Sequence, residues 1–246
     1  MSKVFPFLFC FFVLTALPGQ AVLAQTQPKD TAFVQAAISQ AVGAYRNAIG
    51  NSAHLYTGIE YFDYRKYLRE GHQFLVTDEL VKGDVVYEGI LYEQVPLLYD
   101  IVKDELIVKL ESRAFNQKLI SQKVAQFNWK GQVFQRFPAD SLTSFQSGFY
   151  ELLLQNEVLV LAKRAKIIEE VPENRLIKTV FRRADGYYIQ KDLRYYPITS
   201  KRSLYTVFKD QKKELKRFYR VQDLKFRANK EKTIVAVATE YVSLTK

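Results

Sequence analysis

Two histidines, His54 and His72, are the only imidazoles in the chain, and both fall in an aromatic region between a helical pattern and the first strand pattern. Neutral imidazole is a common zinc ligand, and Glu60, Asp63 or Glu70 offers carboxylate oxygens nearby. The spacing of these residues matches no metal signature, however. We therefore expect no metal site and no bound cofactor.

Hydrolytic chemistry has few candidates in this chain. Ser52 lies two residues from His54, but no G-x-S-x-G turn surrounds it, so serine hydrolysis is disfavoured. A pair of carboxylates is sufficient for glycoside hydrolysis. Three pairs lie close together in the sequence: Glu169/Glu170, Asp84/Glu88 and Asp100/Asp104. Because such pairs arise by chance among 26 acidic residues, an envelope glycan hydrolase is kept only as the alternative function.

A 12-residue segment concentrates aromatic side chains among charged ones: Tyr56, Tyr61, Phe62, Tyr64 and Tyr67. Aromatic rings stack on sugars, and the tyrosine hydroxyl adds a hydrogen-bonding edge. The four tyrosines are therefore candidate binding residues for a glycan. The simpler interpretation, which we prefer, is that these rings pack against one end of a sheet.

Positive charge gathers towards the C-terminus. Residues 174–246 carry 19 Lys and Arg against 7 Asp and Glu, a net charge of +12, whereas residues 25–173 carry −3. A helix predicted over 201–220 has a net charge of +6. Its candidate binding residues are Lys209, Lys212, Lys213 and Lys216. A basic amphipathic helix binds anionic membrane surfaces, although a solvated outer face gives the same pattern.

The first residues predict where the protein is located. Lys3 precedes an apolar run of about 14 residues, shorter than the roughly 20 needed to span a bilayer, and small residues end at Ala24. This pattern is typical of a secretory signal peptide over residues 1–24, cleaved before Gln25. Cys10, the only cysteine, follows a large residue, which disfavours lipid attachment there. We expect an exported protein, periplasmic or associated with the outer membrane and soluble after cleavage, with no disulfide.

Hydrophobic periodicity predicts the elements of residues 25–246, which we interpret as a single domain. Apolar residues spaced by three and four predict a helix over 30–50. From 73 to 198, short apolar runs alternate with turn signals. The predicted strands are 73–77, 84–92, 95–102, 105–111, 123–128, 132–137, 147–154, 157–166, 176–183, 187–191 and 194–198.

Short connections between these strands require antiparallel neighbours. The dipeptide Asp185-Gly186 is the strongest hairpin signal, because both residues tolerate the positive φ of a type I′ turn, and Lys130-Gly131 is a weaker one. About ten strands do not form a flat open sheet. The predicted fold is therefore α+β: an N-terminal helix, one curled antiparallel meander resembling a half-open barrel over 73–198, and a basic C-terminal helical hairpin over 200–245.

Several segments resemble a group of uncharacterised exported proteins from Gram-negative envelopes. They are YTGIEYFDY at 56–64, EGHQF at 70–74, DVVYEGILYEQVPLLYD at 84–100 and SKRS at 200–203. The resemblance implies an envelope location and a single domain, and it implies no activity. We expect a non-enzymatic protein that binds an envelope component or a protein partner. Its basic end favours anionic lipid, lipopolysaccharide or acidic glycan as the partner, and not nucleic acid.

Overall fold

The computed structural model describes residues 28–49, 55, 58–63, 69–109, 114–141, 143–173 and 176–245. The predicted signal peptide lies outside these residues, so it stays a prediction. The chain divides into two units, residues 1–49 and residues 50–246. The first unit contains helix α1 (Pro28–Ile49), which confirms the helix predicted over 30–50. Within the described ranges, no helix is both long enough and apolar enough to cross a membrane.

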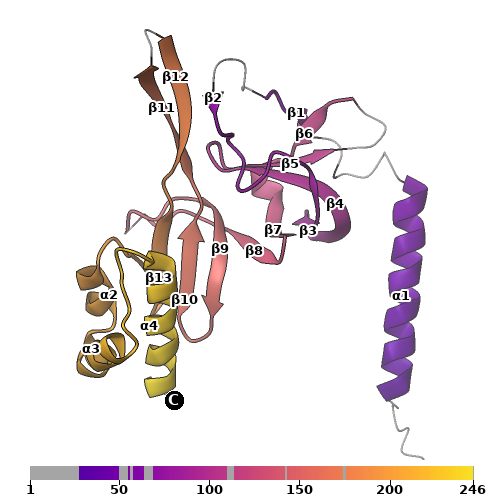
Figure 1. The fold of residues 1–246 in the computed structure, drawn as a ribbon. Helices are drawn as coiled ribbons and strands as arrows, with labels where there is room; N and C mark the ends of the chain where they lie inside the picture. Colours follow the sequence, from indigo (N-terminus) through magenta and orange to yellow (C-terminus); the bar gives the residue numbers. More distant parts are fainter. Residues whose placement is uncertain are drawn as a thin grey trace, which may run out of the picture. The chain divides into compact units, whose positions relative to one another are not determined.

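The second unit is built on an open antiparallel sheet of 11 strands (Figure 1). In spatial order its strands are β1 (Ile59–Glu60), β6 (Asn116–Lys118), β5 (Glu105–Lys109), β4 (Ile90–Asp100), β3 (Val81–Tyr87), β7 (Val124–Trp129), β8 (Gln132–Phe137), β9 (Gly148–Gln155), β10 (Leu159–Lys163), β13 (Gly186–Lys191) and β14 (Arg194–Pro197). The predicted α+β class and the antiparallel meander are confirmed. A short 3-10 turn, η3 (Ser121–Lys123), precedes β7.

The prediction of one continuous sheet over 73–198 is wrong. The chain leaves the large sheet after β10 and forms a second sheet from β11 (Lys166–Glu173), β12 (Leu176–Arg183) and β2 (Arg69–Glu70), with β2 parallel to β12. In Figure 1 the β11–β12 hairpin extends away from the large sheet. The strand predicted over 73–77 is also absent, since that segment makes only a single bridge, between Phe74 and Asp100.

Tight turns close the hairpins where two consecutive residues have positive φ. Lys130 and Gly131 have φ of 50° and 78° between β7 and β8, which confirms that turn. Asp192 and Leu193 form a turn of the same kind between β13 and β14. Asp185-Gly186 does not, because β12 pairs with β11 and β13 pairs with β10. The strongest hairpin signal in the sequence therefore marks a crossing between two sheets.

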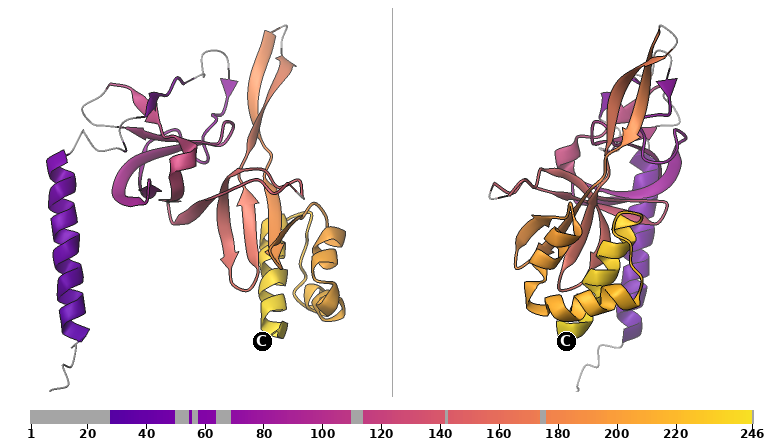
Figure 2. Two further views of the ribbon diagram at one scale, coloured as in Figure 1. Left: turned by 180° about the vertical axis from the view of Figure 1, so that it is seen from behind. Right: turned by 60° about the vertical axis from the view of Figure 1, so that its left-hand side comes forward.

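The C-terminal part is a cap of three helices, and not the predicted two-helix hairpin. It consists of α2 (Lys201–Val207), a 3-10 turn η4 (Lys209–Gln211), α3 (Lys212–Val221) and α4 (Lys230–Thr245). Figure 2 shows these helices gathered beside β10 and β13. The helix predicted over 201–220 is interrupted at Phe208, whose φ and ψ of −104° and 44° are not helical. We refer to residues 200–245 as the helical cap.

Both faces of the sheet are covered where the helical cap packs. Val160 and Ile189 contact the buried side chains of the cap on one face. On the other face Leu161 packs with Phe145 and Tyr150, whose rings stack with centroids 4.4 Å apart. Consecutive residues of a strand point to opposite faces, so a strand buried on both sides is apolar throughout. This explains the unbroken apolar run over 158–161.

Candidate anion-binding site

A pocket of about 850 Å³ lies in the helical cap, between the start of α2, the end of α3 and the connection to α4. Half of the residues that line it are cationic: Lys201, Arg202, Lys225, Arg227 and Lys230. The others include Tyr219, Leu224 and Phe226, and none is acidic. Positive charge and aromatic surface therefore share one cavity.

Two helix starts position the cations. Ser200 accepts a hydrogen bond from the Ser203 amide, and the Ser203 hydroxyl accepts one from the Ser200 amide, so a capping box begins α2 at Lys201. The Asn229 carboxamide oxygen accepts from the amide of Lys232 and begins α4. Each start places a lysine in the first turn of its helix, at the edge of the pocket.

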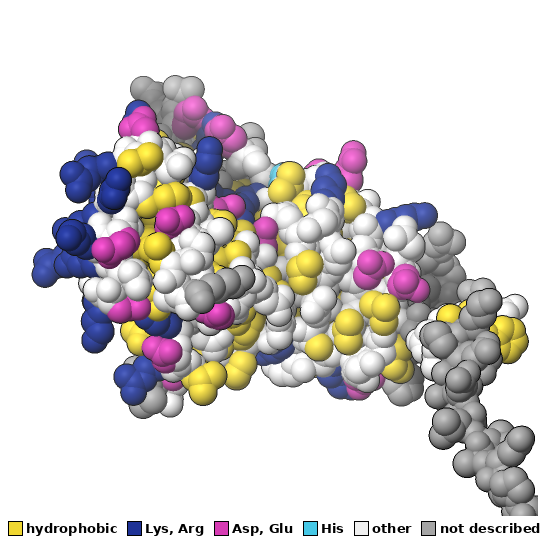
Figure 3. Space-filling view, turned by 90° about the horizontal axis from the view of Figure 1, so that it is seen from below, with side chains coloured by type: hydrophobic (Ala, Val, Ile, Leu, Met, Phe, Trp, Pro, Cys, Tyr) yellow, Lys and Arg dark blue, Asp and Glu magenta, His cyan; other side chains and the backbone are white. Residues whose placement is uncertain are grey.

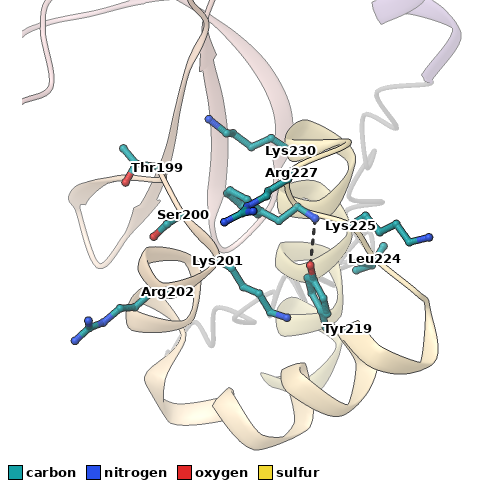
Figure 4. Close-up of a pocket in the computed structure, with 10 residues that line it drawn as sticks. Thr199, Ser200, Lys201, Arg202, Tyr219, Leu224, Lys225, Arg227 and Lys230 are labelled. Atoms are coloured by element: carbon teal, nitrogen blue, oxygen red, sulfur yellow. Dashed lines mark hydrogen bonds between the residues drawn. The ribbon is translucent and has the colours of Figure 1, made fainter.

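Tyr219 holds the α3–α4 connection in place. Its hydroxyl accepts from the Phe226 amide at 3.1 Å (Figure 4). Its carbonyl accepts from the Leu224 amide at 3.1 Å. The Lys225 carbonyl accepts from the amide of Asn229 at 2.9 Å, which closes the turn before α4. The connection is thus fixed by hydrogen bonds at several points along its length.

Aromatic rings support two of the cations. The Lys201 ammonium lies 3.5 Å from the centroid of the Tyr219 ring, and Lys230 lies 5.7 Å from that of Tyr187. Figure 4 shows Lys201 extending towards Tyr219, whereas Arg202 points away on the other side of α2. Burial and the neighbouring Tyr219 raise the pKa of Tyr205 to about 12, so this ring beneath Lys201 stays protonated and neutral.

A smaller hollow of about 360 Å³ adjoins this pocket and shares Ser200 and Arg202 with it. Tyr196, Pro197 and Val207 give it an apolar lining. Like the larger pocket, it is lined by no acidic residue.

The four lysines predicted to bind, Lys209, Lys212, Lys213 and Lys216, are all exposed on η4 and α3. We call them the surface quartet. None of them lines either pocket. The pocket is lined by other cations, on two helix starts and one connection, and none of them was predicted as a site residue: Lys201, Arg202, Lys225, Arg227 and Lys230. Three cations within the six residues from 225 to 230, between two helices, were the available signal.

Among the predicted tyrosines, only Tyr61 lies in the described residues. Tyr56, Tyr64 and Tyr67 lie outside them, as do Ser52 and His54. Tyr61 is 7% exposed, donates a hydrogen bond to Asp100 at 2.8 Å and accepts one from Gln73. Burial, outweighing the Gln73 hydrogen bond, raises its pKa. Tyr61 therefore packs against the sheet, which favours the packing interpretation for this residue.

The carboxylates proposed for glycan hydrolysis already serve the fold. Asp100 accepts from the amides of Val102 and Lys103, and Asp104 accepts from the Tyr99 hydroxyl. Three carboxylates of the other two pairs also have partners: Asp84 with the Gln94 amide, Glu88 with Lys123 and Glu169 with Arg182. Neither of the two pockets is lined by a carboxylate.

Lys166, at the start of β11, contacts the segment before β3. Its titration can be used to test whether this contact is buried. Its ammonium donates to the carbonyls of His72 and Phe74. Burial, followed by the neighbouring Arg183, lowers the pKa of Lys166 to about 8. An unfolded lysine has a pKa of about 10.4, so between about pH 8 and 10 the unfolded chain binds more protons than the folded one.

We therefore expect the free energy of unfolding of the wild type to rise with pH through this window, relative to a Lys166→Met variant. Urea unfolding of both proteins at pH 7.5, 8.5 and 9.5 (roughly the window set by linkage) measures the difference. Tyrosines with raised pKa values lower stability only above about pH 10, where the unfolded chain releases its phenol protons first. A constant difference between the two proteins would show that Lys166 is not buried as described.

Comparison with known proteins gives no match: no family model, no curated protein and no solved structure is similar to this chain.

Proposed function

We propose that this is a non-enzymatic protein of the cell envelope that binds an anionic lipid surface through its helical cap. The predicted signal peptide and the resemblance to exported envelope proteins support the location. The observation that carries the binding role is the surface quartet, four exposed lysines on η4 and α3. Figure 3 shows Lys and Arg side chains gathered at the end of the molecule that holds these helices.

The packing of α3 supports this role. Leu215 is fully buried in the core cluster of the helical cap, so α3 is fixed by its apolar side while the quartet faces solvent. Exposed charges of this kind contribute little to folding. Near an anionic bilayer, in contrast, each Lys or Arg contributes about 1 kcal/mol. The quartet is thus expected to contribute more to the free energy of membrane binding than to the free energy of folding.

Replacing Lys209, Lys212, Lys213 and Lys216 with Gln is expected to weaken binding to anionic vesicles at least about tenfold, since several contributions of about 1 kcal/mol are lost together. The measurement is co-sedimentation with vesicles of phosphatidylcholine and phosphatidylglycerol. Binding of the wild type should also weaken between 0.1 and 1 M salt, as the Debye length falls from about 10 Å to about 3 Å.

A matched control removes the same charge elsewhere. Lys82, Lys103, Lys123 and Lys130 are exposed and lie on β3, η3 and two turns of the large sheet. Their replacement with Gln should leave vesicle binding near the wild-type value. Equal weakening in both four-lysine variants would contradict a localised binding face, and retention of an acidic polysaccharide but not of vesicles would replace lipid with glycan as the partner.

A further inference from the structure

The pocket of the helical cap differs from the surface quartet, because it is a concave site whose positive charge is not neutralised by the protein. Throughout the described part of the chain, no carboxylate forms an ion pair with Lys201, Arg227 or Lys230. Lys225 pairs with Asp223 at 3.3 Å, but both side chains are largely exposed, and such pairs contribute little. The pocket is thus lined by several like charges, and no described acidic residue lines it.

Like charges that line one cavity repel each other, and a bound anion relieves that repulsion. The aromatic contacts of Lys201 and Lys230 hold each ammonium in position without neutralising it. Because the Tyr219 hydrogen bonds fix the connection that carries Arg227, less flexibility is lost when an anion binds. The site is prepared for an anion with several acceptor atoms.

The size and lining of the cavity narrow the class of ligand. About 850 Å³ exceeds what a free inorganic anion fills, and Leu224, Phe226 and Tyr219 offer apolar contacts beside the cations. A phosphate monoester carries a charge of about −1.5 to −2 at pH 7 and has three strong acceptor oxygens, whereas a carboxylate, a sulfonate or a phosphodiester carries a single charge. Separate ammonium and guanidinium donors match the monoester best.

We infer that this pocket binds the phosphate group of a phosphate monoester that carries an apolar or aromatic body. The inference deepens the proposed function, because it assigns a specific ligand group to the same helical cap. It uses Lys201, Arg227 and Lys230, none of which belongs to the surface quartet. A lipid headgroup and a soluble phosphorylated molecule share this chemistry.

Phenyl phosphate and benzenesulfonate are the probes, since they present the same ring on a dianion and on a monoanion. Titration calorimetry at constant ionic strength should show binding of phenyl phosphate to the wild type and binding of benzenesulfonate at least about tenfold weaker. The pocket variant, with Lys201, Arg227 and Lys230 replaced by Gln, should bind phenyl phosphate at least about tenfold more weakly, because the charge-assisted hydrogen bonds to the phosphate are removed.

The matched control replaces Lys209, Lys212 and Lys213 with Gln, which removes the same charge from the same helical cap. It should bind phenyl phosphate within about twofold of the wild type, since its charges lie outside the cavity. Equal losses in the two triple variants, or equal affinity for the two probes, would overturn the inference. If the pocket variant fails to fold by circular dichroism, the single variant Arg227→Gln, exposed on the connection, replaces it.

Vesicles distinguish the two sources of the phosphate. If a lipid supplies it, the wild type prefers phosphatidic acid, a monoester, over phosphatidylglycerol, a diester, and the pocket variant loses that preference. If a soluble molecule supplies it, phenyl phosphate binds and the vesicle preference is absent. Vesicle binding that depends on the quartet, together with no binding of phenyl phosphate, would keep the proposed function and reject the pocket as a phosphate site.

Discussion

Replacing Arg164 with Ala is expected to lower the free energy of unfolding by about 3–5 kcal/mol, because it leaves buried carboxylates without their cation. The Arg164 side chain is 6% exposed and lies between β10 and β11. It forms ion pairs with Glu151 on β9 at 2.5 Å, with Asp185 at 2.9 Å and with Glu231 on α4 at 2.6 Å. One guanidinium thus connects the large sheet, the crossing to β13 and the helical cap.

The electrostatics of this site agree with the expected size of the loss. Burial by itself would lower the pKa of Arg164, but hydrogen bonds with Glu231, Glu151 and Asp185 outweigh it and raise the pKa. Lysine does not replace the planar fork of arginine at a site with several partners, so Arg164→Lys should recover only part of the loss. Guanidinium chloride unfolding of the wild type and both variants measures these differences.

Arg182→Ala is the matched control. Arg182 pairs with Glu169 across β11 and β12, but the two side chains are 59% and 38% exposed. Exposed pairs typically contribute about 0–1 kcal/mol. If Arg164→Ala cost no more than Arg182→Ala, the three carboxylates would not depend on Arg164, and the contact between the helical cap and the sheet would rest on apolar packing and on other polar pairs such as Lys191 with Asp210.

The same ion pairs explain two errors in the predicted sheet, at the end of β10 and at the expected turn of Asp185-Gly186. A strand was predicted over 157–166, but β10 ends at Lys163, because Arg164 turns inward to reach its carboxylates. Asp185 accepts hydrogen bonds from the Ala165 amide and from the Arg164 guanidinium. Its carboxylate therefore binds the start of β11 and does not form the expected hairpin turn with Gly186. These partners are 13 or more residues apart, so no local pattern reveals them.

Local chemistry did predict the features that depend only on neighbouring residues. The turn at Lys130-Gly131 and the helix over 30–50 follow from the conformational preferences of a few residues. The turn at Asp192-Leu193 could not be found in this way, because leucine rarely adopts positive φ and gives no turn signal. Its conformation is fixed by the pairing of β13 with β14.

For the candidate site, the sequence predicted only that its charge is positive. The sequence placed a net positive charge at the C-terminal end, and the pocket lies there. The individual residues could not be chosen, because Lys201, Arg227 and Lys230 line one pocket only when the start of α2, the end of α3 and the α3–α4 connection come together. That arrangement depends on where the helix predicted over 201–220 breaks.

Replacing Phe208 with Ala is expected to destabilise the protein by about 3–5 kcal/mol, as for other large buried aromatic side chains. Phe208 is fully buried at the break between α2 and η4, and its ring stacks on that of Tyr241 in α4, with centroids 4.3 Å apart. The break also brings Asp210 to the Tyr241 hydroxyl at 2.8 Å and to Lys191 on β13 at 3.0 Å. These contacts join three parts of the second unit.

The sequence contained a weak sign of this break. The apolar stripe passes from Phe208 to Leu215 with Gln211 and Lys212 at the positions where a continuous helix would need an apolar residue. Val221→Ala is the control, because Val221 is 74% exposed on α3 and surface changes of this kind stay within about 0.5 kcal/mol. A clear drop in the urea midpoint for Phe208→Ala alone is expected. Similar small effects of both substitutions would mean that Phe208 does not hold the helical cap on the sheet, and the arrangement of α2, α3 and the α3–α4 connection around the pocket would need another cause.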